Sequence, residues 1–142
     1  MYDALDIAKY IIDKCYNGGY PVTNLRLQKL LYFIQGISYQ QRNMRLFNND
    51  FYAWPYGPVI PEVYFQYCGY AGVPIRMNYN VEIDIDTADL IDNTIDMFSP
   101  YSDWDLVNFT HEDGSPWCFH EKNRGLIPKK EIRQYFRHLE EF

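Results

Sequence analysis

The segment at residues 51–64, FYAWPYGPVIPEVY, restricts the fold of this chain more than any other stretch. It combines five aromatic residues with Pro55, Pro58 and Pro61 and a single glycine. Each proline fixes its φ angle and lacks an N–H group, so the segment fits neither the middle of a helix nor a central strand. We expect a stiff turn between two elements, anchored by Trp54. Such a turn also suits a protein partner, because tryptophan and tyrosine dominate the hot spots of interfaces.

Two amphipathic helices are expected in the N-terminal third. Asp3 is placed to cap the first, which carries apolar residues at helical spacing and ends at Gly18-Gly19. Thr23 is placed to cap the second. The buried stripe of this second helix is expected to contain Leu27, Leu30, Leu31, Ile34 and Ile37, which makes the helix the centre of the core. Gly36, inside the same helix, predicts a close crossing by another backbone.

The rest of the chain is expected to add a small β element and further helices. One or two short strands are predicted within residues 46–54, around an Asn48-Asn49 turn, and the alternation VEIDID at residues 81–86 predicts a half-buried strand. Helices are expected from Pro61, after a cap at Asp86 or Thr87, after a Ser102–Asp105 capping box, and from Pro128. These patterns predict a predominantly helical α+β fold, with residues 1–142 forming a single compact domain.

Charge is distributed unevenly along the chain. The net charge is −6, and between Arg76 and Lys122 there are eleven acidic residues and no lysine or arginine. Such an interval repels nucleic acid and attracts basic partners, although a solvated acidic face that aids solubility explains it equally well. Asp89, Asp92 and Asp96 follow spacings of three and four, so a helix would place them on one exposed face.

A group of potentially reactive side chains lies in the last quarter of the chain: His111, Glu112, Cys118 and His120. A cysteine near a histidine is typical of a nucleophile and its base, and this residue set is also able to hold zinc. Their spacing matches neither a catalytic signature nor a common zinc motif. We therefore expect structural roles and no catalytic, cofactor or metal site. For His111 we expect hydrogen bonds that brace the adjacent turn.

Several observations point to a cytoplasmic protein. No apolar run reaches the roughly 20 residues of a spanning helix, and the N-terminus lacks the pattern of a signal peptide. The three cysteines are odd in number and widely spaced, which argues against a disulfide framework. The basic residues of the C-terminal segment favour a solvated helix face over nucleic-acid binding. We expect neither a membrane nor a nucleic acid as partner.

Three stretches together resemble the signature of a known family. They are TNLRLQKLLYFIQG (residues 23–36), the proline-rich segment described above, and FTHEDGSPW (residues 109–117). In this order and spacing they resemble the Panacea-domain antitoxins, a family that includes phage-associated GepA-like proteins and SocA-like antitoxins. The resemblance implies a small, mainly helical, prophage-associated domain that neutralises a cognate toxin by direct binding. In the SocA-like branch it also implies delivery of the toxin to a protease.

The sequence therefore predicts an antitoxin that binds a growth- or translation-inhibiting toxin and occludes its active site. Two alternatives stay open: a proteolytic adaptor, and an enzyme that uses His111, Glu112 and Cys118. The acidic interval would complement a basic groove on a toxin that acts on phosphates. The residues expected to bind the partner are Trp54, Tyr56, Gly57, Pro58, Pro61, Asp89, Asp92, Asp96, His111 and Trp117.

Overall fold

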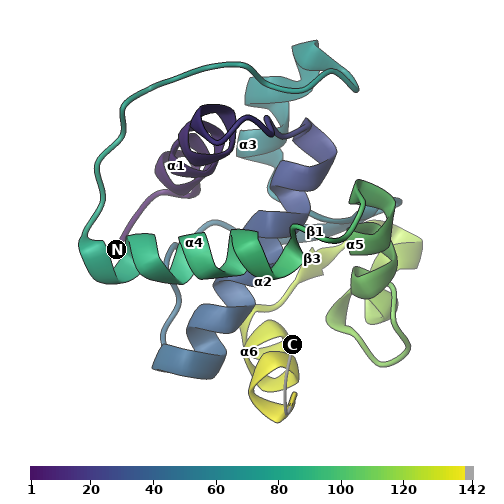
Figure 1. Cartoon of the computed structure of the whole chain (residues 1–142). Helices are drawn as coiled ribbons and strands as arrows, with labels where there is room; N and C mark the ends of the chain where they lie inside the picture. The colour runs from purple at the N-terminus through teal and green to yellow at the C-terminus, as the bar shows by residue number, and fades with distance from the viewer. Residues whose placement is uncertain (140–142) are drawn as a thin grey trace.

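A computed structural model describes residues 1–139 of the chain, and Figure 1 shows its architecture. The elements are α1 (Ala4–Asn17), α2 (Asn24–Arg42), β1 (Phe51–Trp54), β2 (Gly57–Val59), α3 (Pro61–Tyr67), α4 (Ile85–Phe98), α5 (Asp103–Thr110), β3 (Leu126–Ile127) and α6 (Lys129–His138). Three short 3₁₀ turns, Cys68–Tyr70, Pro116–Phe119 and Glu121–Asn123, lie between them. This arrangement confirms a predominantly helical α+β fold with a small β element.

Helix α2 is the centre of the fold, as its apolar stripe predicted. Figure 1 shows it running through the middle of the molecule, with α1, α4 and α6 packed around it. Leu27, Leu30, Leu31, Ile34 and Ile37 are all buried. Burial extends well beyond this stripe, because α2 has neighbours on nearly every side, and polar residues such as Gln28 and Gln35 are also enclosed.

Gly36 allows the close approach of α6, although not by the backbone crossing that the sequence predicted. A Cβ atom at this position would lie 2.4 Å from ring atoms of Phe136, which is fully buried on α6. The neighbour that occupies this space is therefore an aromatic side chain. The rings of Tyr32 and Phe33 both meet the Phe136 ring edge to face, with centroid distances of 5.4 and 6.2 Å.

Of the four side-chain caps predicted at helix starts, three are found where they were expected. The side chains of Asp3, Thr23 and Ser102 each accept a backbone hydrogen bond in the first turn of their helix. Ser102 also forms the predicted capping box with Asp105. The start of α4 was predicted wrongly, because Asp84 caps this helix two or three residues earlier than expected, with Thr87 N–H as donor at 3.0 Å.

The proline-rich segment forms a β-hairpin and the start of α3. Strand β1 pairs antiparallel with β2, and β3 pairs with β1 on its other side. Pro58 lies in β2 at the sheet edge, where its missing N–H group leaves no ladder bond unmade. The reversal falls at Pro55-Tyr56, so the turn predicted at Asn48-Asn49 was placed incorrectly. The Asn49 side chain instead accepts the Ala4 N–H at 3.0 Å.

The predicted strand at VEIDID is wrong. Residues 81–84 form neither a strand nor a helix, and α4 begins at Ile85. The carboxylate of buried Asp13 on α1 accepts the N–H groups of Tyr79 and Val81, which takes the place of a neighbouring strand. The alternation still has a physical origin, because Val81 and Ile83 are half-buried whereas Glu82 is exposed.

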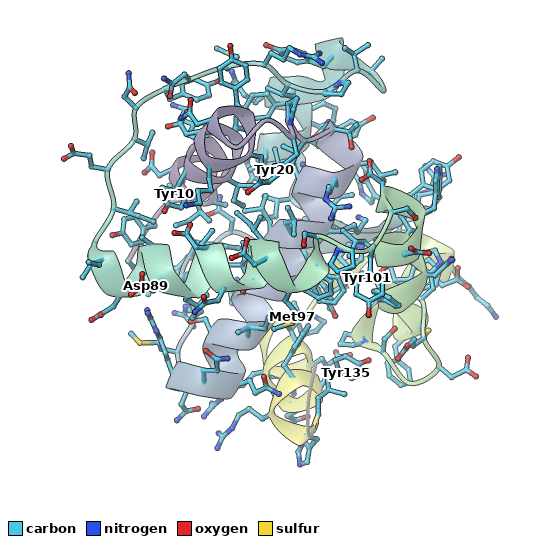
Figure 2. All side chains as sticks on the ribbon, viewed as in Figure 1. Tyr10, Tyr20, Asp89, Met97, Tyr101 and Tyr135 are labelled. Carbon is cyan, nitrogen blue, oxygen red and sulfur yellow. The ribbon has the colours of Figure 1, made fainter. Side chains whose placement is uncertain are left out.

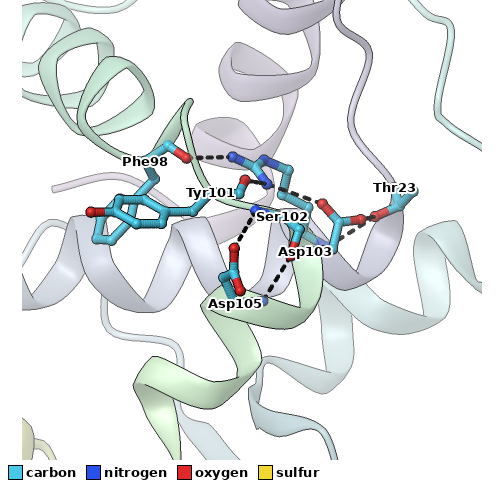
Figure 3. A network of polar contacts seen from close by, with 7 residues as sticks. Thr23, Phe98, Tyr101, Ser102, Asp103 and Asp105 are labelled. Atoms are coloured by element: carbon cyan, nitrogen blue, oxygen red, sulfur yellow. Dashed lines mark hydrogen bonds and ion pairs between the residues drawn. The ribbon is translucent and has the colours of Figure 1, made fainter.

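A polar network joins the end of α4 to the start of α5 (Figure 3). The guanidinium group of Arg26, on α2, donates to the carbonyl oxygens of Phe98 and Tyr101, both at 2.8 Å, and to the Asp103 carboxylate at 3.1 Å. Thr23 donates its hydroxyl to the same carboxylate at 2.7 Å. Phe98 is the last residue of α4 and Asp103 the first residue of α5, so these bonds tie both helix ends to α2.

Candidate functional site

The three sequence stretches that carry the family resemblance converge on Lys29. This residue lies on α2 and is completely buried, and its Nζ donates to the Pro58 carbonyl oxygen at 2.6 Å. Gly57, with φ of +108°, sits against it: an added Cβ would lie 2.8 Å from Lys29 Cε and 2.7 Å from Thr110 Oγ1. Burial lowers the pKa of the Lys29 ammonium group to about 7. The hairpin is thus held against α2 and α5, and there is no room for a residue larger than glycine at position 57.

Two more polar side chains of α2 bind the backbone of the proline-rich segment. Gln28 Oε1 accepts the Ile60 N–H at 3.0 Å, and Asn24 Nδ2 donates to the Tyr64 carbonyl at 3.3 Å. Gln28 also donates to Asn24 Oδ1 at 3.1 Å. Ile60 lies beyond the last paired residue of β2, so its N–H group has no partner in the sheet and a side chain supplies one. Sequence reasoning missed both residues, although their spacing of four beside an apolar stripe was a usable signal.

Trp117 and His111 hold the hairpin from the other side. Trp117 Nε1 donates to the Trp54 carbonyl oxygen at 2.7 Å, and the His111 and Trp117 rings stack with a centroid distance of 3.7 Å. The His111 Nε2 atom is buried without a hydrogen-bond partner. The predicted bracing by hydrogen bonds is therefore corrected to bracing by ring stacking. Burial, followed by the nearby Lys29 charge, lowers the pKa of His111.

This framework presents an aromatic face, formed by Trp54, Tyr56, Tyr64, Phe65 and Trp104. Tyr56 and Trp104 are 58% and 55% exposed, and their rings meet edge to face at 5.3 Å. A cleft of about 450 Å³ lies between this pair and Tyr64, with Lys29 among the residues lining it. Large aromatic side chains that remain exposed beside a cleft are typical of a protein-binding surface.

Comparison with known proteins identifies the family. The family model described as "Antitoxin SocA-like, Panacea domain" matches residues 27–118, which include Lys29, the hairpin and the His111–Trp117 stack. The chain belongs to this family. It is also 32% identical over 129 residues to Antitoxin SocA of Caulobacter vibrioides (strain NA1000 / CB15N), covering 81% of this chain and 68% of that protein. No solved structure matches the chain.

The acidic residues of α4 in this Panacea-domain chain lie apart from the aromatic face. They adjoin α1, whereas the aromatic face is built from the hairpin, α3 and α5; Figure 2 shows Asp89 and Tyr10 on the α1 side of the molecule. Asp92 accepts a hydrogen bond from Tyr10 at 2.8 Å and forms an ion pair with Lys14 at 3.4 Å. Asp89 and Asp96 are exposed. The structure therefore leaves two of the three predicted acids open to a partner.

The group of potentially reactive side chains is divided among separate contacts. The Cys118 thiol donates to the Glu112 carbonyl at 3.2 Å, while His120 pairs with Glu131 of α6 at 2.9 Å. Within residues 1–139, no three histidine, cysteine or acidic side chains are placed to share a metal ion. In the same range, no helix is both long and apolar enough to span a bilayer.

Proposed function

We propose that this Panacea-domain chain is a non-catalytic antitoxin that binds a cognate protein toxin through its aromatic face and occludes the toxin's active site. The observation that carries the proposal is the exposed Tyr56–Trp104 pair, which rests on a hairpin fixed by buried hydrogen bonds. Family membership supplies the expectation of a toxin partner, since both the family description and the relative's name contain the word antitoxin.

The rigidity of the hairpin favours tight binding. Lys29, Gln28 and Trp117 each hold one of its backbone groups, at 2.6, 3.0 and 2.7 Å. A surface that is already ordered loses little conformational entropy when a partner binds. Tyr56 and Trp104 would therefore contribute most of their contact energy to affinity.

Alanine substitution tests the aromatic face. Tyr56→Ala and Trp104→Ala should each weaken toxin binding by about 2 kcal/mol, roughly 30-fold in Kd, because aromatic residues dominate interface energies. Binding of the toxin encoded beside this gene would be measured by calorimetry. The melting temperature should stay close to wild type, because both rings are more than half exposed.

Met44→Ala is a matched control for this experiment. Met44 is 56% exposed and follows the C-terminal end of α2, whereas the hairpin rests on the N-terminal half of that helix. Wild-type affinity in both aromatic variants would exclude the aromatic face as the toxin site. Toxin inhibition that persists in a purified mixture without any protease would favour occlusion over the adaptor alternative.

Salt dependence tests the role of the α4 acids. If Asp89 and Asp96 attract a basic toxin, the association rate should fall steeply with salt, because the Debye length drops from about 10 Å at 0.1 M to about 3 Å at 1 M. Asp89→Asn combined with Asp96→Asn should flatten this dependence in stopped-flow measurements. Asp92 is left in place because it binds Tyr10 and Lys14.

The control for the charge experiment removes two exposed acids elsewhere, by Asp6→Asn and Glu121→Gln. This variant has the same net charge as the α4 variant, so a smaller effect on the salt dependence assigns the attraction to α4. An association rate that is insensitive to salt in the wild-type protein would contradict the proposed electrostatic role.

A further inference from the structure

A second cavity, distinct from the cleft of the aromatic face, lies where α2, α4, α5 and α6 meet. Its volume is about 390 Å³. Figure 2 shows Met97, Tyr101 and Tyr135 on the near side of the molecule around the place where α4, α5 and α6 come together. Six aromatic rings line the cavity: Tyr32, Phe33, Phe98, Tyr101, Phe109 and Tyr135.

The aromatic walls extend from the core to the surface. Phe33 and Phe98 are buried and stack at 4.5 Å, while Tyr101 is 44% exposed and meets Phe109 edge to face at 5.0 Å. The Arg26 bonds to the carbonyl groups of Phe98 and Tyr101 hold this wall in place (Figure 3). The faces of aromatic rings carry partial negative charge and attract cations, most strongly where water is excluded.

The polar groups of the cavity are also suited to a cation. Glu112 is exposed at the cavity and is the single carboxylate among the lining residues within 1–139, which include neither lysine nor arginine. The hydroxyl groups of Ser115 and Thr110 already donate to backbone carbonyls at 2.8 and 2.7 Å. A positively charged occupant would thus meet a carboxylate and no opposing cation.

Tyr32 provides the group that points to a ligand. Its side chain is fully buried, and its hydroxyl oxygen has no hydrogen-bond partner. Burial raises the pKa of Tyr32 well above its usual range, so the phenol stays neutral. Tyr32 lines the cavity, and because buried polar groups are rarely left unpaired, we expect its oxygen to accept a hydrogen bond from a donor that enters from outside the chain.

We propose that this cavity binds an arginine side chain of the toxin, and this inference rests on the proposed function. The guanidinium group stacks on the aromatic walls, donates to the Tyr32 hydroxyl oxygen and pairs with Glu112. Arginine fits better than lysine because its planar group stacks on rings and carries five N–H donors that reach two acceptors at once. The net charge of −6 and the acid-rich interval favour a basic partner.

The position of the cavity agrees with the aromatic face. Helix α5 contributes Trp104 to the aromatic face and Phe109 to the cavity. Residues five apart on a helix lie about 140° from each other around its axis, so a toxin contacts both when it wraps around α5. One anchor residue inserted beside a larger aromatic contact is a common arrangement in protein interfaces.

The test uses a small probe, N-acetyl-arginine amide, titrated into the full chain and followed by NMR. Chemical shift changes are expected for Tyr101, Phe109 and Tyr135, which line the cavity. N-acetyl-citrulline amide has nearly the same shape without the charge, and it should bind about tenfold more weakly, as loss of a desolvated cation–π contact implies. The lysine derivative should also bind more weakly.

Two variants make the test specific. Glu112→Gln should weaken binding of the arginine probe several-fold, while Glu121→Gln, an exposed acid outside the cavity, should not. Tyr32→Phe should weaken probe binding without lowering the melting temperature, because the hydroxyl group that it removes has no partner in the chain. If the hydroxyl group had a purely structural role, Tyr32→Phe would instead lower the melting temperature and leave probe binding unchanged.

Equal binding of the arginine and citrulline derivatives, or no shift changes up to the solubility limit of the probe, would overturn the inference. So would a lysine derivative that binds as well as the arginine derivative. If the probe fails while Tyr56→Ala still weakens toxin binding, the cavity inference alone is wrong. If the probe binds but the toxin does not, the cavity is a guanidinium site, whereas the proposed function and the toxin as the source of the arginine are both wrong.

Discussion

Phe136→Ala is expected to lower the free energy of unfolding by about 3–5 kcal/mol, the usual range for removing a fully buried aromatic ring. The ring is completely buried on α6 and packs against Gly36 of α2, between Tyr32 and Phe33. Its loss leaves a cavity at the helix crossing that the rigid neighbouring rings cannot fill. Urea denaturation monitored by circular dichroism measures the effect.

Gly36→Ala is expected to lower the free energy of unfolding of the wild-type chain but to raise that of the Phe136→Ala variant. In the wild-type chain the new Cβ would lie 2.4 Å from ring atoms of Phe136, so the substitution should cost about 1–3 kcal/mol through overpacking. In the Phe136→Ala background the space is open, and alanine should stabilise the helix by up to about 1 kcal/mol relative to glycine. The double-mutant cycle isolates this contact.

Gly69→Ala is the control for this cycle, because no atom lies within 4 Å of the Cβ that it adds. Its effect should be small and the same in both backgrounds. A cost for Gly36→Ala that is unchanged after removal of the Phe136 ring would show that the glycine serves a purpose other than making room for that ring.

The buried Lys29 should make stability depend on pH in a defined direction. Burial lowers its pKa in the folded state to about 7, from about 10.4 in the unfolded chain. Between these values the unfolded state binds more protons, so the free energy of unfolding rises with pH. Relative to Lys29→Met, the wild-type value should therefore increase between pH 7 and 8.5, with a slope approaching about 1.4 kcal/mol per pH unit.

Other titrations contribute little to this comparison between pH 7 and 8.5. The lowered pKa of His111 acts at lower pH, and the raised pKa of Cys15, about 12, reduces stability only as pH exceeds the unfolded thiol value near 8.5. Both groups are present in wild type and variant. Lys14→Met, on the surface of α1, should keep the wild-type pH dependence. The prediction would be contradicted if the free energies of unfolding of wild type and Lys29→Met differed by the same amount at every pH in this range. Lys29 would then not lose its proton in the folded state.

Local chemistry explains which elements were predicted well. The caps at Asp3, Thr23 and Ser102 and the stop at Gly18 depend on bonds within three or four residues, so the sequence specifies them directly. The apolar stripe of α2 likewise needs only the helical period. The strand predicted at VEIDID failed because pairing requires a neighbour, and Asp13, nearly 70 residues away in sequence, bonds that backbone instead.

The candidate site shows the same division. The sequence alone determined the family and the stiffness of the proline-rich segment that contains Tyr56, because these depend on residue type and order. Only the tertiary structure decided that Trp104 would join it, that Lys29 would be buried beneath Pro58, and that the α4 acids would lie beside α1. Contacts between distant segments depend on how the whole core packs, which short-range patterns in the sequence do not specify. Lys29 is buried because its ammonium group finds a hydrogen-bond acceptor in the Pro58 carbonyl group.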